Sequence, residues 1–478
     1  MRCFYAFRVV VHRIRRLWRV LLYSTNRAGL EARREVADWF TVVLCRARYI
    51  HHRQRRGGRI QSCLTPAITD KPYPRRLMRN SDYPRRPVCR RSKSGVLSGV
   101  ATGLLFLSLS LPALAGPREQ AKRIHDRLTG VPPTQDVLDD MEAEIRSRNP
   151  LGAALIAIDG PDNPSAPNFY NVTLKNFVTP WTNREQSVFA PLNDYTATVI
   201  GMVRDEVPFN QVLSADILYV GNGPGVRPYS PASNVHYVDL ETLGIDLSNP
   251  ANLSRVSQSA VTGIPSAATA GVVTSRAASE AFFIAGTNRA MFRFTFMNHL
   301  CNDLEQVKDT TRTADRIRQD VSRSPGGDSR IFLNSCVGCH AGMDPMAQAY
   351  AHYDYDETLG RLVYTPGQVQ PKYLINADNF KYGYVTPDDA WDNYWRSGPN
   401  AILGWNSGLP GRGNGAKSLG EELAASDAFA TCQVSKAFRN VCLRDPTQTQ
   451  LDSLTAVFKA GYVLKHVFAE AAVQCMGD

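Results

Sequence analysis

Apolar residues recur at helical spacing near both ends of the sequence. In the segment QDVLDDMEAEIRSR (135–148), apolar side chains three or four residues apart would form one helix face, and Thr134 is suited to cap its N-terminus. The segment QLDSLTAVFKAGYVLKHVFAEAAVQC (450–475) shows the same spacing, with apolar residues at Leu451, Leu454, Phe458, Leu464 and Phe468. Both patterns predict helices that bury one face in a core.

Further helical patterns lie in the middle of the chain. They cover residues 192–206, 275–286, 288–301, 313–323 and 418–442. A helix starting at Met346 is expected to take Asp344 as its N-cap and Pro345 as its first residue. Residues 221–232 are rich in Gly and Pro, and residues 362–417 are aromatic and poor in helical pattern, so both stretches are predicted to be loops.

The positive charge of the sequence is confined to its first part. The formal net charge is +11 at pH 7, but residues 1–100 hold 24 Lys and Arg against 5 Asp and Glu, whereas the remainder holds 31 against 39. The later part therefore has no excess of basic residues, and we do not expect nucleic acid as a partner.

A secretory signal is predicted over residues 78–115. The basic run RRPVCRRSK precedes the apolar stretch SGVLSGVATGLLFLSLSLPALA, which ends in the small-x-small pattern Ala113-Leu114-Ala115. A transmembrane anchor is the alternative, because the apolar run approaches the ~20 residues that a spanning helix needs. The Ser-rich composition and the cleavage pattern favour removal before Gly116. We therefore expect an exported, periplasmic bacterial protein with no stable membrane span after cleavage.

Residues 1–77 precede this signal and are rich in Arg, with no clear repeat and no uninterrupted apolar span. Because signal peptides begin at the N-terminus, Met78 is favoured as the start of the translated chain. A basic leader domain over residues 1–77 is the alternative.

The clearest chemical motif lies in NSCVGCHAGMDP (334–345), where two residues separate Cys336 from Cys339 and His340 follows directly. A zinc site would need two further ligands at short spacing, and the next cysteine downstream is Cys432. A thioredoxin-like redox pair would need a βαβ context, which is not evident before the motif. In an exported protein the motif favours one haem c, bound covalently through Cys336 and Cys339, with His340 as the proximal iron ligand.

The sixth ligand of this iron is left open by the sequence. A low-spin electron carrier usually takes a methionine from well downstream, but no methionine lies between Met346 and Met476. The nearest imidazole is His352, and the preceding helix offers Met297 and His299 as further candidates. An open or water-bound position is the alternative.

Four cysteines of the expected mature chain lie outside the motif: Cys301, Cys432, Cys442 and Cys475. An oxidising compartment allows two disulfides among them. If one helix carries Cys432 and Cys442, they are about 15 Å apart along it, beyond the roughly 7 Å that a bridge tolerates. We therefore expect Cys301 to pair with one of them and Cys475 with the other. Free buried thiols are the alternative.

Several segments resemble the family of exported proteins with planctomycete-type cytochrome c domains. The most specific is CVGCHAGMDPMAQAYAHYD, and IHDRLTGVPPTQDVLDDM, AGVVTSRAASEAFFIAGTNRAMFRFTFMNHLC and SDAFATCQVSKAFRNVC resemble other parts of the family. The resemblance covers most of residues 121–475. It implies a covalent haem c and an exported location and names no substrate. Ala347 and Ala351 stand where the family usually has Gly and Glu, so this chain lacks that carboxylate.

The expected fold is mainly α, multi-helical and loop-rich, with a c-type haem-binding segment and a C-terminal helical region. Its segments are a leader or misassigned start over 1–77, a signal peptide over 78–115, an N-terminal helical region over 116–300, a haem-binding region over 301–395 and a C-terminal helical region over 396–478. The expected function is electron transfer by a periplasmic monohaem c-type cytochrome with a protein redox partner, alone or as the haem subunit of a larger oxidoreductase. A haem enzyme with an open axial site and a haem-stabilised binding module are the alternatives.

Overall fold

The structure is a computed structural model that describes residues 115–284 and 286–477. The leader expected over 1–77 and the signal peptide expected over 78–115, apart from Ala115, lie outside the described residues. The described part is mainly helical and contains three small antiparallel sheets of two strands each, which confirms the mainly α, multi-helical fold expected from the sequence. None of its helices is long and apolar enough to cross a membrane.

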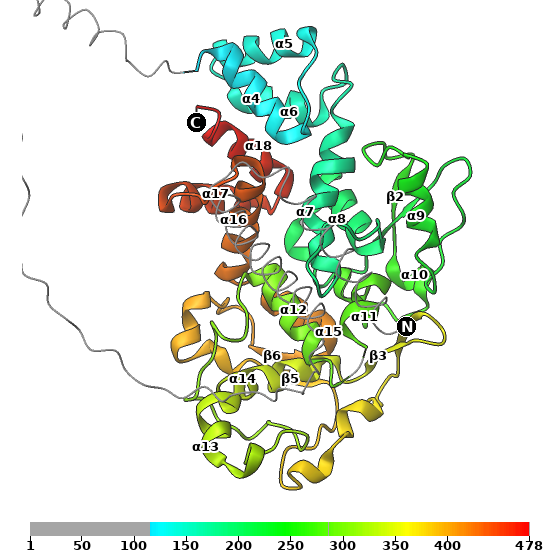
Figure 1. The fold of residues 1–478 in the computed structure, drawn as a ribbon, viewed down its shortest axis with the longest axis vertical. Helices are drawn as coiled ribbons and strands as arrows, with labels where there is room; N and C mark the ends of the chain where they lie inside the picture. Colours follow the sequence, from blue (N-terminus) through cyan, green and yellow to red (C-terminus); the bar gives the residue numbers. More distant parts are fainter. Residues whose placement is uncertain (1–114, 285, 478) are drawn as a thin grey trace, which may run out of the picture. The chain divides into compact units, whose positions relative to one another are not determined.

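The first helices of this part pack against the last one. The helices concerned are α4 (Pro117–Thr129), α5 (Gln135–Arg146), α6 (Pro150–Asp159) and α18 (Leu464–Gln474). Helix α18 lies against α4 and α6, so the two ends of the described chain are side by side (Figure 1). The Thr134 side chain accepts the N–H of Val137 at 3.4 Å and caps α5 as expected. Met141, on the predicted apolar face of α5, is fully buried.

Helix α8 (Asp194–Arg204), all of whose residues are buried, forms the centre of the next part of the chain. The elements around it in the sequence are α7 (Lys175–Val178), α9 (Val235–Thr242), α10 (Gln258–Thr262), α11 (Arg276–Phe282) and the antiparallel pair β1 (Leu218–Gly221) and β2 (Leu253–Val256). The buried Asp194 carboxylate accepts the N–H groups of Arg276 at 2.6 Å and Ala277 at 3.0 Å. The first residue of α8 therefore also caps α11 and fixes the angle between the two helices.

The chain around Cys336 combines three helices with two small sheets. These are α12 (Arg289–Leu300), α13 (Ser329–Ile331), α14 (Val337–Ala347), β3 (Tyr353–Asp356) paired with β4 (Arg361–Tyr364), and β5 (Ala390–Asp392) paired with β6 (Arg412–Asn414). Helices α12 and α14 lie against each other (Figure 1). This contact brings the motif next to the core helix that precedes it in the sequence.

The prediction of a helix over residues 313–323 was wrong. The segment has no regular helix in the structure. The carbonyl group of Ile317 accepts the N–H of Tyr384 at 3.0 Å, and Arg318 forms an isolated parallel β-bridge with Tyr384. Hydrogen bonds to a distant segment have thus replaced the local bonds of a helix. The helix propensity of single residues determines the backbone conformation only weakly where tertiary contacts of this kind compete with it.

The C-terminal region consists of α15 (Gly415–Ala424), α16 (Asp427–Cys442), α17 (Gln448–Gly461) and α18. The helical pattern expected over 418–442 is divided at Ser426, whose side chain accepts the N–H of Phe429 at 3.1 Å and caps α16. The expected helix through Cys432 and Cys442 is confirmed, since both residues belong to α16.

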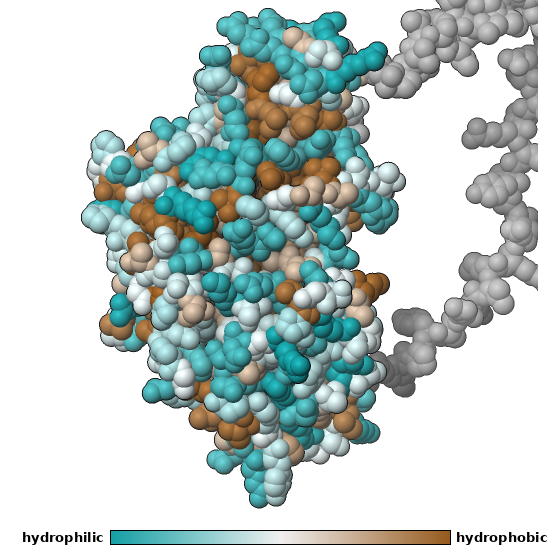
Figure 2. All heavy atoms as spheres, turned by 180° about the vertical axis from the view of Figure 1, so that it is seen from behind, coloured by the Kyte–Doolittle hydropathy of each residue, from teal (hydrophilic) through white to brown (hydrophobic). Residues whose placement is uncertain are grey.

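One hydrophobic core runs through the described residues, from Ala121 in α4 to Cys475 after α18. All three regions expected after residue 116 contribute to it. A small second cluster lies beside the motif and consists of Ile317, Val321, Phe332, Val337 and Ala341. Seen from behind, the surface carries apolar patches between polar residues, most clearly over the upper part, level with α4 to α6 (Figure 2).

Two disulfides fasten α16 to other parts of this core. Cys301, directly after α12, pairs with Cys432, and Cys442 pairs with Cys475, with Cα atoms 5.3 and 5.9 Å apart. The pairing of Cys432 with Cys442 is excluded as expected, and the choice that the sequence left open is resolved. Helix α16 is therefore tied to the ends of both α12 and α18.

We expect mass mapping of a non-reduced digest of the purified protein to recover Cys301 linked to Cys432 and Cys442 linked to Cys475. The reason is that one rigid helix keeps Cys432 and Cys442 too far apart to bridge. Reduction of the same digest should separate both pairs of peptides and serves as the control. A peptide with Cys432 linked to Cys442 would contradict the continuous helix α16.

Candidate functional site

Cys336, Cys339 and His340 lie at the start of one continuous helix. A turn of π-helix over Phe332–Cys336 leads directly into α14, so that Cys336 precedes the helix and Cys339 lies one turn further on. Helical residues three apart lie on the same side, with Cβ atoms about 5–6 Å apart. Both thiols are free and partly exposed, whereas the other four cysteines of the described residues form disulfides. The structure thus sets these two thiols apart as a pair available for chemistry.

The loop that follows α12 fixes the turn between the two thiols. The N–H of Asp309 donates to the carbonyl group of Gly338 at 2.9 Å. Gly338 lies close to this loop, since a Cβ atom there would lie 2.6 Å from Cγ of Lys308 and would force that side chain to shift. The loop starts at Cys301, and the disulfide to Cys432 anchors that end to α16. The loop therefore lies close to α14 at Gly338, and its first residue is fastened to α16.

The surroundings of Cys339 disfavour a redox-active thiol pair. Its Sγ lies 3.6 Å from the carbonyl oxygen of Leu304. Burial and the nearby Glu305 carboxylate raise the pKa of the Cys339 thiol above its usual value. Reactive thiols of redox pairs have the opposite property, a lowered pKa that keeps them as thiolates.

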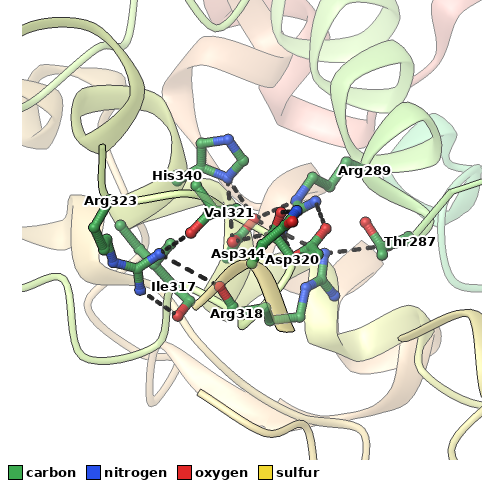
Figure 3. A network of polar contacts seen from close by, with 10 residues as sticks. Thr287, Arg289, Ile317, Arg318, Asp320, Val321, Arg323, His340 and Asp344 are labelled. Atoms are coloured by element: carbon green, nitrogen blue, oxygen red, sulfur yellow. Dashed lines mark hydrogen bonds and ion pairs between the residues drawn. The ribbon is translucent and has the colours of Figure 1, made fainter. Parts of the chain in front are cut away.

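His340 directly follows Cys339 and contacts Asp344, which lies one helical turn further along α14. The imidazole Nδ1 lies 3.2 Å from each oxygen of the carboxylate, as suits residues four apart on a helix. The Asp344 side chain is completely buried, and the His340 side chain is 21% exposed. The other ring nitrogen, Nε2, points away from the polar network (Figure 3). Because a carboxylate only accepts hydrogen bonds, the neutral form of the ring has its proton on Nδ1 and its lone pair on Nε2.

The prediction of Asp344 as N-cap and Pro345 as first residue of a new helix was wrong. Helix α14 runs through both residues to Ala347, and a 3₁₀ turn follows it. The Asp344 carboxylate is directed to charged side chains and not to backbone N–H groups at a helix start. Pro345 lies in the last turn of α14, where its missing N–H leaves a single carbonyl group, that of Ala341, without its usual donor.

Arg289 of α12 holds the Asp344 carboxylate in place. Its Nε and Nη2 donate to the two Asp344 oxygens at 2.7 and 2.9 Å, and its Nη1 and Nη2 donate to Asp320 at 2.5 and 2.9 Å. A second guanidinium group, that of Arg318, lies 3.8 Å from Asp344 Oδ1 (Figure 3). Burial acts to raise the pKa of Asp344, but Arg289, His340 and Arg318 outweigh it and hold that pKa well below its usual range. Asp344 is therefore an ionised carboxylate whose charge is balanced by the guanidinium groups of Arg289 and Arg318.

Arg323 closes the network on the side of the irregular segment. Its guanidinium donates to the carbonyl groups of Val321 at 2.6 Å and Ile317 at 2.8 Å. It also lies over the rings of Phe332 and Phe380, 4.9 and 4.4 Å from their centroids. These contacts replace the hydrogen bonds that residues 317–321 would have made in a helix, and they keep Asp320 facing Arg289.

Of the two candidate histidine ligands, His299 makes a polar contact, whereas neither ring nitrogen of His352 makes a hydrogen bond within the described residues. His299 is buried, its Nε2 lies 2.7 Å from the Tyr195 hydroxyl oxygen, and burial holds the pKa of its imidazole well below the usual range. His352 is also buried, and its Nδ1 lies 3.2 Å from Asp389 Oδ2. Met297 is partly buried on α12. The polar contact of His340 is with Asp344 and with none of these three residues.

The residues of the motif fit a covalent haem. A haem iron takes four ligands from the porphyrin and needs only one or two from the protein, whereas a zinc ion takes all or most of its ligands from the protein. Within residues 115–284 and 286–477, no group of three or more His, Cys, Asp and Glu side chains is arranged to hold a metal ion. Two exposed apolar side chains, Ile331 and Leu333, lie five and three residues before Cys336 and suit the neighbourhood of an apolar ring.

No protein-family model matches the sequence, and searches of curated proteins and of solved structures found no match either. The interpretation of the site therefore rests on the residues around His340 and on their chemistry.

Helix α14 lies directly on the indole ring of Trp395. This ring is completely buried and packs on Phe292 and Phe296 of α12, with centroids 6.0 and 5.3 Å apart. Gly342 faces the indole, and a Cβ atom at this position would lie 2.0 Å from Nε1 of Trp395. The glycine thus allows the helix that carries His340 to approach the core closely.

We expect Gly342→Ala to lower the free energy of unfolding by about 1–3 kcal/mol, because the added methyl group must displace either the buried indole or α14. Urea unfolding followed by circular dichroism would measure the change. The matched control is Gly461→Ala at the end of α17, where a Cβ atom would lie 3.6 Å from Val463 Cγ2, an ordinary contact. Equal changes in the two variants would show that α14 does not depend on close contact with Trp395.

Proposed function

We propose that the mature chain is an exported, periplasmic c-type cytochrome with one covalent haem, which exchanges electrons with a protein partner. The observation that carries this proposal is the pair of free thiols, Cys336 and Cys339, one helical turn apart and followed by His340, whose Nε2 points away from the network that binds Nδ1. The export of the chain rests on the signal pattern over 78–115. Membership of the planctomycete-type cytochrome c family, which the motif segment resembles, belongs to the same proposal.

Each residue of the motif has its own task in this proposal. The thiols of Cys336 and Cys339 would form thioether bonds to the porphyrin, and His340 would bind its iron through Nε2. The haem supplies the one-electron couple between ferric and ferrous iron. Asp344 orients the His340 ring by accepting a hydrogen bond from its Nδ1–H group.

The groups around His340 favour electron transfer over bond-making chemistry. The carboxylate in contact with it, Asp344, is buried and bound to Arg289, so it is not free to take a proton from a substrate. Asp320 is bound to the same guanidinium group. The two thiols are partly exposed, so a haem attached to them has an edge near the surface, where a protein partner can approach.

A haem enzyme with an open sixth position is the second candidate, and one observation favours it. The Nε2 atom of His299 makes a contact of 2.7 Å with the Tyr195 hydroxyl group, and a histidine that keeps this contact cannot use that nitrogen as a ligand, which favours an iron open to water or a substrate. The two candidates differ in what the iron binds and not in how the haem is attached.

Covalent attachment is the first prediction of the proposal. When the chain is expressed with a cytochrome maturation system, its band on a denaturing gel should keep haem-linked peroxidase staining, and the Cys336→Ala and Cys339→Ala double variant should lose it. The matched control is the double variant Cys301→Ser and Cys432→Ser, which also removes two cysteines but should keep the stain, because its thioether bonds do not depend on that disulfide. If the intact mass of the wild-type protein equals that of the polypeptide without bound haem, the proposal is contradicted.

Electron transfer is the second prediction. We expect the purified protein to be oxidised and reduced reversibly by one electron at an electrode, and to turn over peroxide no faster than free haem. Carbon monoxide binding measures the openness of the iron in the same sample. Rapid binding of carbon monoxide, combined with peroxide turnover far above that of free haem, would replace the carrier by the enzyme.

A further inference from the structure

We propose that Asp344, held by Arg289, is a positioning residue that fixes the His340 ring and lowers the reduction potential of the haem. This inference rests on the proposed function, because it concerns the protein side of a haem ligand. It goes further by assigning the control of the potential to one buried carboxylate and its counter-ions.

The geometry of the contact between Asp344 and His340 fixes the tautomer of the ring. Both oxygens of Asp344 lie 3.2 Å from Nδ1 of His340, so the proton of the ring is shared between two acceptors. The carboxylate is completely buried and cannot turn outward to water. It therefore selects the tautomer with the proton on Nδ1 and leaves Nε2 as the only ring nitrogen that can bind a metal.

The charge of the Asp344 carboxylate affects the basicity of the His340 ring. A carboxylate that accepts the distal ring proton of a ligating histidine makes that histidine a more basic ligand. A more basic ligand stabilises ferric over ferrous iron and so lowers the reduction potential. Arg289 and Arg318 act against this effect, because they compensate the charge of Asp344. The three residues together set how much negative charge the His340 ring senses.

The network also contains a second carboxylate, that of Asp320, which serves as a matched comparison for Asp344. Asp320 accepts two hydrogen bonds from the Arg289 guanidinium, as Asp344 does, and its side chain is only 9% exposed. Asp320 does not contact His340 in this network (Figure 3). Asp344→Asn and Asp320→Asn therefore remove the same charge from the same guanidinium, and only the first changes the partner of the imidazole.

The test compares the reduction potentials of the haem-loaded wild-type protein and of these two variants. We expect Asp344→Asn to increase the ratio of reduced to oxidised haem at fixed potential at least tenfold, which is about 59 mV for one electron, and Asp320→Asn to have a clearly smaller effect. The NMR signal of the His340 Nδ1 proton should shift in Asp344→Asn and stay in place in Asp320→Asn. Equal effects in both variants would overturn the inference, since they would show a general effect of buried charge. No effect in either variant would overturn it as well.

A second variant covers the case in which Asp344→Asn does not fold. Arg289→Lys keeps the positive charge but loses the planar pair of donors that binds two carboxylates at once. Asp344 then becomes a stronger acceptor for His340, and the potential should fall below that of the wild type; an unchanged or higher potential would contradict the inference. A wild-type protein without covalent haem would instead refute the proposed function, and it would do so before any variant is compared.

Discussion

The buried ion pair between Arg289 and Asp344 is the contact on which the arrangement around His340 depends. It joins α12 to α14, and the same guanidinium group also binds Asp320 in the irregular segment between these helices. A buried carboxylate without a counter-charge costs several kcal/mol. The charged residues of α12, of α14 and of the irregular segment with Asp320 can therefore be buried only beside one another. This requirement fixes how the three segments pack.

Three different kinds of interaction hold helix α14 in place. Charge holds it to α12 through Arg289, close packing holds it to the indole of Trp395 through Gly342, and a backbone hydrogen bond holds it to the loop after Cys301. Because these interactions differ in range and direction, they restrict translation and rotation of the helix together. The thiols and the imidazole consequently stand on a rigid element, as a site needs if its ligands are to keep their geometry.

Features that depend on neighbours in the sequence could be predicted. The Thr134 cap follows from its place before an apolar stripe, and the exclusion of a Cys432–Cys442 bridge follows from the rise of a helix. The contact of His340 with Asp344 also had a sequence signal, the spacing of four residues, but the following proline suggested a helix start at this point.

Features that depend on distant residues could not be predicted. Arg289 is 55 residues away from Asp344, and no local pattern marks one arginine among many as its partner. The segment over 313–323 has a helical composition, yet its backbone bonds Tyr384, which only the folded chain brings near. The pattern Cys336-x-x-Cys339-His340 is visible from spacing alone, whereas the residues that surround it in the fold are not.

The contact between the two ends of the described chain has a consequence for the order in which the fold is completed. Helices α4 and α6 bury their apolar faces against α18, and Arg123 donates to the carbonyl group of Met476 across a separation of 353 residues. Such distant contacts pay a large loop-closure entropy before they contribute stability, which makes them late events in folding. The core around the first helices therefore stays incomplete until the last helix has been synthesised. Cys336 and Cys339 emerge well before that moment, so a period exists in which both thiols are present on a chain that has not yet closed.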